Sequence, residues 1–76
     1  MEIKSFVKNF AAQFEETDSS QFTDETDFRN IQEWSSLTAM CIIAMVDEEY
    51  SVKLTGNDIQ KSKTIKDIFD IIKSRK

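Results

Sequence analysis

The residues best placed to do chemistry are the serines of Trp34-Ser35-Ser36-Leu37, which come immediately before a long apolar stretch. Ser35 suits the N-cap of a helix that begins at Ser36, so the Ser36 hydroxyl would lie at the surface in the first turn. Free N–H groups at a helix N-terminus stabilise an anion, and they would favour a phosphate attached to this hydroxyl. Serine in this position is also an ordinary helix cap, so the tetrapeptide alone leaves both interpretations open.

Other kinds of chemistry have little support in the sequence. The chain contains no histidine, so no Ser-His or Cys-His pair can activate a nucleophile. Cys41 is the lone cysteine, which excludes an intrachain disulfide and fits a reducing compartment. The acidic stretch 23–27 lacks the glycine and final glutamate of a calcium loop, and no glycine-rich phosphate loop is present. The sequence therefore predicts a protein that is not an enzyme and holds no metal.

Length and charge set further limits. A chain of 76 residues suits one small domain, which we expect to span residues 1–76. The net charge of −4 argues against nucleic acid as a partner. Residues 1–50 have a net charge of −8 and residues 51–76 a net charge of +4, which predicts an acidic surface for basic partners. The longest apolar run, 39–46, is shorter than the roughly 18 residues that span a bilayer, and we expect a soluble, cytoplasmic protein.

Hydrophobic periodicity predicts an all-α fold. Apolar residues at three-four spacing indicate a helix from about Glu2 to Glu16, and a second helix is expected over 36–50. A short helix is expected near 57–60, and Thr64 with Asp67 suggests a capping box that starts the last helix. The expected fold is a small four-helix bundle of three main helices and one short one. Its long first loop is expected to be anchored by the apolar side chains of Phe22, Phe28, Ile31 and Trp34. The apolar stripe of the last helix consists of Ile65, Ile68, Phe69 and Ile72.

The helix predicted over 36–50 has two apolar faces. The first contains no charge, whereas the second contains Glu48 and has Asp47 at its edge. Burying unpaired carboxylates is costly, so the first face should form the core and the second should be at least partly exposed. An exposed face of Leu and Met rimmed by acids is typical of a partner-binding surface, the alternative being a helix buried on both sides. The first face is Ala39, Ile42, Ile43, Val46 and Tyr50; the second is Leu37, Met40, Cys41, Ala44 and Met45.

The stretch from Trp34 to Met40, followed by Val46-Asp47-Glu48-Glu49-Tyr50, resembles the acyl carrier protein family. Members of that family share an Asp-Ser-Leu motif followed by a helix that ends in an acidic run and an aromatic residue. The spacing from serine to aromatic residue fits without a gap, and residues 51–72 are also similar. Trp34 resembles a Trp-Asp-Ser-Leu subgroup of specialised carriers, although a packing anchor for the loop is an alternative role for this side chain.

The resemblance implies that a separate, magnesium-dependent phosphopantetheinyl transferase attaches 4′-phosphopantetheine from coenzyme A to Ser36. The thiol of this arm would carry acyl groups as thioesters between enzymes of fatty-acid or related polyketide or specialised lipid biosynthesis. Those partners would be acyl-transferring, synthase or ligase enzymes with basic docking patches, and the carrier would be a monomer without membrane insertion. Partner contacts are implied for Leu37, Met40, Met45, Asp47 and Glu48, and an interior that can shelter an acyl chain for Ile42, Ile43, Val46 and Phe69.

One departure from the family motif bears directly on the site. Ser35 stands where the motif has Asp, so the negative charge expected beside the attachment serine is missing. A transferase that depends on that carboxylate would act poorly on this chain. The missing Asp favours one alternative to the acyl carrier, an unmodified carrier-like module that binds or regulates an enzyme. A carrier for aminoacyl cargo is a second alternative, because the sequence does not identify the cargo.

Overall fold

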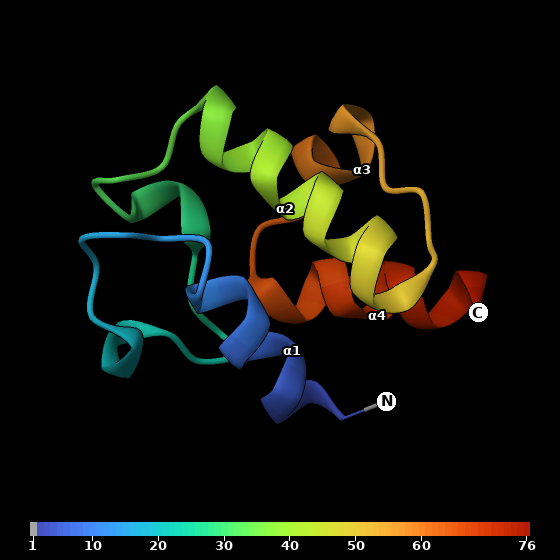
Figure 1. The fold of residues 1–76 in the computed structure, drawn as a ribbon, viewed down its shortest axis with the longest axis horizontal. Coiled ribbons are helices and arrows are strands. Elements are labelled where there is room, and N and C mark those ends of the chain that lie inside the picture. Colours follow the sequence, from blue (N-terminus) through green and yellow to red (C-terminus); the bar gives the residue numbers. More distant parts are fainter. Residues whose placement is uncertain (1) are drawn as a thin grey trace.

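The computed structural model describes residues 2–76, in which four α-helices surround a shared core. They are α1 (Ile3–Ala11), α2 (Ser36–Tyr50), α3 (Gly56–Lys61) and α4 (Ile65–Arg75), with short 3-10 helices at Ser19–Gln21 and Phe28–Asn30. Figure 1 shows the long α1–α2 connection at one end of the molecule, away from the C-terminal end of α4. No β-strand forms within residues 2–76, so the predicted all-α fold is confirmed. No helix in this part of the chain has the length and apolar character needed to cross a membrane.

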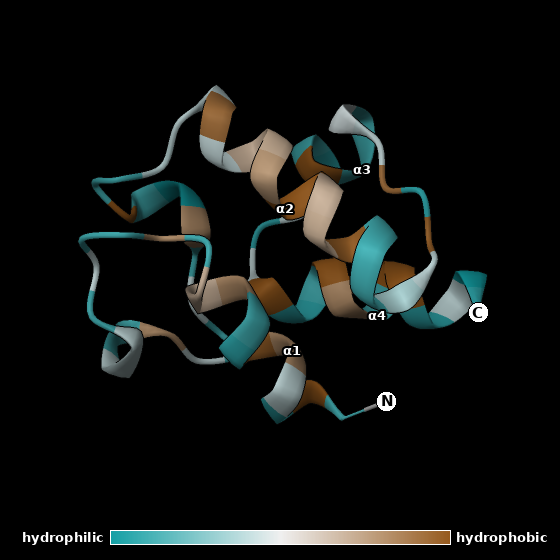
Figure 2. Ribbon diagram, viewed as in Figure 1, coloured by the Kyte–Doolittle hydropathy of each residue, from teal (hydrophilic) through white to brown (hydrophobic). Residues whose placement is uncertain are grey.

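The core is built from the apolar faces of the helices and is rich in aromatic rings. In Figure 2 apolar and polar positions alternate along α1 and α4, as expected of helices with one buried face. Phe6 of α1 lies with its ring centroid 5.7 Å from those of both Tyr50 and Phe69, so it joins α1 to α2 and α4. The predicted apolar stripe of α4 is confirmed, because all four of its members are buried: Ile65, Ile68, Phe69 and Ile72.

Helix α1 is shorter than predicted. It ends at Ala11, whereas the apolar spacing predicted a helix that continues to Glu16. After Ala11 the chain tightens into turns, in which Phe14 donates its N–H to the carbonyl of Ala11 at 3.0 Å. The next three N–H groups, of residues 15–17, donate to the carboxylate of Glu33 instead of to the helix. Phe14 is buried even though it lies outside α1. The apolar spacing that predicted the helix therefore extends past its end.

The long connection is pinned to the core by apolar side chains, as predicted. Phe22 and Phe28 are buried, and Trp34 is half-buried with its ring centroid 4.7 Å from that of Phe28. The connection also supplies hydrogen-bond acceptors for the first N–H groups of α4, which have no partner within the helix. The carbonyls of Thr26 and Asp24 accept the N–H groups of residues 65 and 66 at 3.2 and 2.9 Å.

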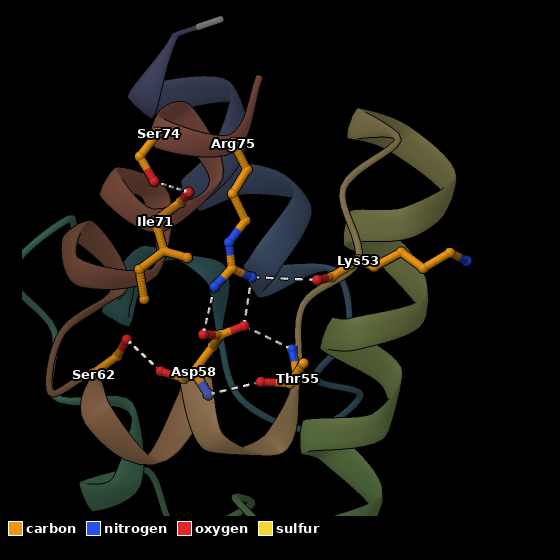
Figure 3. A network of polar contacts seen from close by, with 7 residues as sticks. All are labelled: Lys53, Thr55, Asp58, Ser62, Ile71, Ser74 and Arg75. Atoms are coloured by element: carbon orange, nitrogen blue, oxygen red, sulfur yellow. Dashed lines mark hydrogen bonds and ion pairs between the residues drawn. The ribbon is translucent and has the colours of Figure 1, made fainter.

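The short helix α3 is fastened at its N-terminal end by an ion pair that the sequence did not indicate. Asp58 is only 5% exposed and accepts two hydrogen bonds from the Arg75 guanidinium, at 2.6 and 2.8 Å (Figure 3). It also accepts the N–H of Thr55, which completes a capping box, while Arg75 donates to the carbonyl of Lys53. The Arg75 hydrogen bonds outweigh the opposing effect of burial and hold the pKa of the Asp58 carboxyl far below its usual range.

We expect Asp58→Asn to lower the midpoint of thermal unfolding at pH 7 by roughly 5 to 15 °C, because it removes the buried carboxylate that pairs with the partly exposed Arg75. A carboxylate with a lowered folded pKa stabilises the protein fully above its unfolded pKa of about 4. Its contribution is lost as the pH falls further, so the gap between wild type and variant should shrink below about pH 4. Thermal unfolding of both proteins, followed by circular dichroism at pH 7, 4 and 2.5, measures this difference in melting midpoint.

Asp70→Asn provides the matched control for this prediction. Asp70 pairs with Lys66 at 3.0 Å, but both side chains are about half exposed. A surface ion pair of this kind contributes little to the free energy of unfolding, so Asp70→Asn should melt close to wild type at every pH. A gap for Asp58→Asn that stays constant from pH 7 to pH 2.5 would contradict the assignment of that gap to the charge of Asp58.

Candidate functional site

The two adjacent serines at the start of α2 have different structural roles. Ser35 has an extended backbone and its side chain accepts the N–H of Thr38 at 3.3 Å, which confirms it as the N-cap. Ser36 is the first residue of α2; it is exposed, and its hydroxyl hydrogen-bonds to none of residues 2–76. Capping therefore occupies the Ser35 oxygen and leaves the Ser36 oxygen accessible to another molecule.

A polar network behind these serines fixes where α2 begins. Thr38 is buried, and its hydroxyl donates to the carbonyl of Glu33 at 3.2 Å and lies 3.2 Å from the Ser35 hydroxyl. The Glu33 carboxylate accepts the Thr17 hydroxyl and three N–H groups from residues 15–17. Burial raises the pKa of Glu33, but the combined hydrogen bonds outweigh it and leave that pKa below its ordinary value. Glu33 thus ties the turns that follow α1 to the segment that precedes α2.

Sequence reasoning missed both residues of this network. Thr38 stands three residues after the cap, where a hydroxyl can reach back towards the capping side chain, so a signal for it existed. Glu33 had no local signal, because its partners lie about sixteen residues earlier in the chain.

A cavity of about 520 Å³ opens beside Ser36, between the first half of α2 and α3. A second cavity of about 300 Å³ continues along α2 and shares Met40 and Ile43 with the first. Together they form a largely apolar groove that leads from Ser36 towards Asp47 and Lys53. The first cavity is lined by Arg29, Trp34, Ser35, Ser36, Ala39, Met40, Ile43, Gly56, Ile59 and Gln60.

The outer face of α2 agrees with the prediction except at one position. Leu37 and Met40 are 71% and 65% exposed, and Asp47 and Glu48 are exposed towards the C-terminal end of the same helix. Met45 was also expected on this face, and that prediction is wrong because its side chain is only 6% exposed. Met45 lies about 60° from the fully buried Ile42 around the helix axis, so the elements that cover Ile42 also cover Met45.

The expected interior residues divide in a similar way. Ile42 and Val46 are fully buried and Phe69 is nearly so, which places all three in the core as predicted. Ile43 is half-buried and forms a wall of the groove instead. The cavity therefore brings Ser36 together with Met40 and Ile43, while Ile42, Val46 and Phe69 lie in the packed core behind it.

A comparison with protein-family models gives a match to the family described as phosphopantetheine attachment site, over residues 5–72. The chain belongs to the phosphopantetheine attachment site family. The match confirms the resemblance to acyl carrier proteins, and members of this family carry 4′-phosphopantetheine covalently attached. No curated protein and no solved structure matched the chain. The Trp-Asp-Ser-Leu subgroup stays a prediction that depends on Trp34.

The residues around the cavity fit this cofactor. A phosphopantetheine arm needs an accessible hydroxyl for a phosphodiester, and Ser36 presents one without a competing hydrogen bond. The groove that begins there offers apolar wall for the arm, and Arg29 supplies a cation in the same cavity. When bound, the arm supplies a flexible tether that ends in a thiol able to form thioesters.

We expect alanine substitutions of the two serines to separate the cap from the accessible hydroxyl. Ser35→Ala should lower the free energy of unfolding by about 0.5 to 2 kcal/mol, because it removes an N-cap. Ser36→Ala should change it by less than about 0.5 kcal/mol, as at an exposed position without a partner. Urea unfolding followed by circular dichroism measures both. A larger loss for Ser36→Ala than for Ser35→Ala would show that the roles are reversed.

Proposed function

We propose that this chain is a non-catalytic acyl carrier that receives its phosphopantetheine arm on Ser36. The main support for this proposal is that the two serines have different roles. Ser35 caps α2, whereas the exposed Ser36 hydroxyl adjoins the groove. A phosphopantetheinyl transferase would join Ser36 Oγ to the phosphorus that bears pantetheine. The bond from that phosphorus to adenosine 3′,5′-bisphosphate would break, and the hydroxyl proton would pass to a base of the transferase.

The Ser35 cap bears on the Asp that is missing from the motif. Ser35 meets the capping requirement at that position, so α2 starts at the expected residue without a carboxylate. What is lost is only the negative charge next to Ser36. This supports a carrier whose fold at the attachment site is intact, and its transferase would have to act without that charge.

The outer face of α2 is the proposed docking surface for the transferase and for the enzymes that load and unload cargo. Leu37 and Met40 present apolar side chains next to the attachment residue, and the acids lie at the other end of the helix. Asp47 is 3.4 Å from Lys53, but both side chains are well exposed, so a basic partner can displace this weak pair. Met45 is not part of this surface because it is buried.

The proposed cargo is an acyl group of fatty-acid or related lipid or polyketide synthesis. The groove that leads away from Ser36 is mainly apolar, with Met40, Ile43 and Leu54 among its walls. An apolar wall suits acyl chains better than the charged amine of an aminoacyl cargo, because desolvating an unpaired charge is costly. We further propose that residues 1–76 act as one carrier unit and as a monomer.

Incubation with coenzyme A, magnesium and a broad-specificity phosphopantetheinyl transferase tests this function. Intact mass should increase by one phosphopantetheine, and fragmentation should place it on Ser36. Ser36→Ala should abolish the gain, whereas Ser35→Ala should retain it, because the Ser35 hydroxyl is engaged in capping and the Ser36 hydroxyl has no hydrogen-bond partner among residues 2–76. An unmodified chain, tested also with the transferase of the native host, would overturn the carrier and favour the module that is never modified.

Charge reversal tests the docking surface. The double variant Asp47→Lys with Glu48→Lys should slow arm attachment by the transferase roughly tenfold at low salt, since acidic rims steer association with basic partners. The effect should fade at high salt, because ions screen exposed charges. Asp24→Lys with Glu25→Lys makes the same charge change on the α1–α2 connection and should have a much smaller effect. Equal slowing by both double variants would count against a specific docking surface.

A further inference from the structure

Arg29 stands apart from the charges around it. It is the one basic residue between Lys8 and Lys53, in a half of the chain whose net charge is −8. The structure places it in the wall of the cavity that also contains Ser36. A cation therefore lies in the same cavity as the proposed attachment serine.

The guanidinium is held in place from one side. Its Nη2 atom donates to the carbonyl oxygens of Ile59 and Gln60, at 2.7 and 2.9 Å, near the C-terminal end of α3. The group also lies over the ring of Phe28, 5.3 Å from its centroid. Since both carbonyl residues line the same cavity, these bonds fix the guanidinium at the cavity wall.

The rest of the guanidinium has no partner in the described part of the chain. Its Nη1 and Nε atoms form no hydrogen bond with residues 2–76, and no carboxylate there forms an ion pair with Arg29. Arg75 is the contrast, because a carboxylate takes both ends of its fork. Arg29 thus has a charge and three N–H donors that no carboxylate of residues 2–76 takes up.

We propose that Arg29 binds the phosphodiester of the arm attached to Ser36 and so positions the arm at the mouth of the groove. The planar fork of arginine suits phosphate oxygens, which it can meet with two parallel N–H donors. The inference rests on the proposed attachment to Ser36. Arg29 acts here as a positioning residue, which holds the first group of the arm and takes no part in thioester chemistry.

Lys53 is the other cation on the groove, and it provides the matched control. Its side chain is 86% exposed and pairs with Asp47 at the far end of the groove from Ser36. A phosphodiester on Ser36 would therefore meet Arg29 and not Lys53. The difference between these two residues separates a specific contact from general attraction by positive charge.

Nuclear magnetic resonance of the loaded protein tests the proposal, after intact mass and fragmentation have shown the arm on Ser36. On loading, the Arg29 Nε–H resonance should shift and exchange more slowly with water. The ³¹P resonance of loaded Arg29→Gln should move from the wild-type position towards that of the urea-unfolded loaded protein. Arg29→Lys should retain part of the wild-type shift, and Lys53→Gln should retain all of it.

Each outcome has a distinct meaning. A ³¹P resonance that is the same in wild type and Arg29→Gln, with an Arg29 Nε–H unmoved by loading, would overturn the contact while leaving the carrier function intact. Absence of loading on Ser36 would remove the proposed function and this inference together. If Arg29→Gln does not fold, the Nε–H response of wild type and the ³¹P shift of Arg29→Lys still decide the question.

Discussion

The packing of the fully buried Phe10 ring is the interaction on which the rest of the fold depends. Its ring packs against rings from α1, the turn after it and the long connection: Phe6, Phe14, Phe22, Phe28 and Trp34. A connection over residues 12–35 would lose much conformational entropy on folding, and buried aromatic area offsets that loss. Trp34 is the last member of the cluster and precedes the cap by one residue. The aromatic cluster therefore determines where α2 starts, and with it where Ser36 is presented.

Polar contacts refine the position that the aromatic cluster sets. The Glu33 carboxylate gathers N–H groups of residues 15–17, which would otherwise be left without partners after α1 ends early. The Glu33 carbonyl and the Ser35 hydroxyl both meet Thr38. The side chains of Glu33, Ser35 and Thr38 thus all hold the backbone around the start of α2. This arrangement leaves Ser36 as the free hydroxyl of a family whose members carry a covalent arm.

Two arginines hold α3, which forms the wall of the cavity opposite α2. A helix of six residues is too short to be stable alone, so contacts with the rest of the protein must maintain it. Arg75 binds Asp58 in the first turn of α3, and Arg29 binds two carbonyls near the C-terminal end of α3. Only the Arg29 contacts join the acidic first half of the chain to the basic second half, because Arg75 and Asp58 both belong to residues 51–76. A fixed α3 keeps the groove beside Ser36 open as a defined surface.

Residues that act through near neighbours were predictable from the sequence. The Ser35 cap, the bounds of α2, the Thr64–Asp67 capping box and the apolar stripe of α4 all arise within a few residues, and all are confirmed. The early end of α1, the burial of Met45 and the partners of Glu33, Arg29 and Arg75 were not predictable, because each depends on contacts between distant segments. The sequence by itself determined the all-α fold, the family and the exposure of the Ser36 hydroxyl, through local periodicity and capping. Only the tertiary structure decided which charges meet and how α2 is rotated, because packing of the whole chain selects one arrangement among the many that local pattern allows.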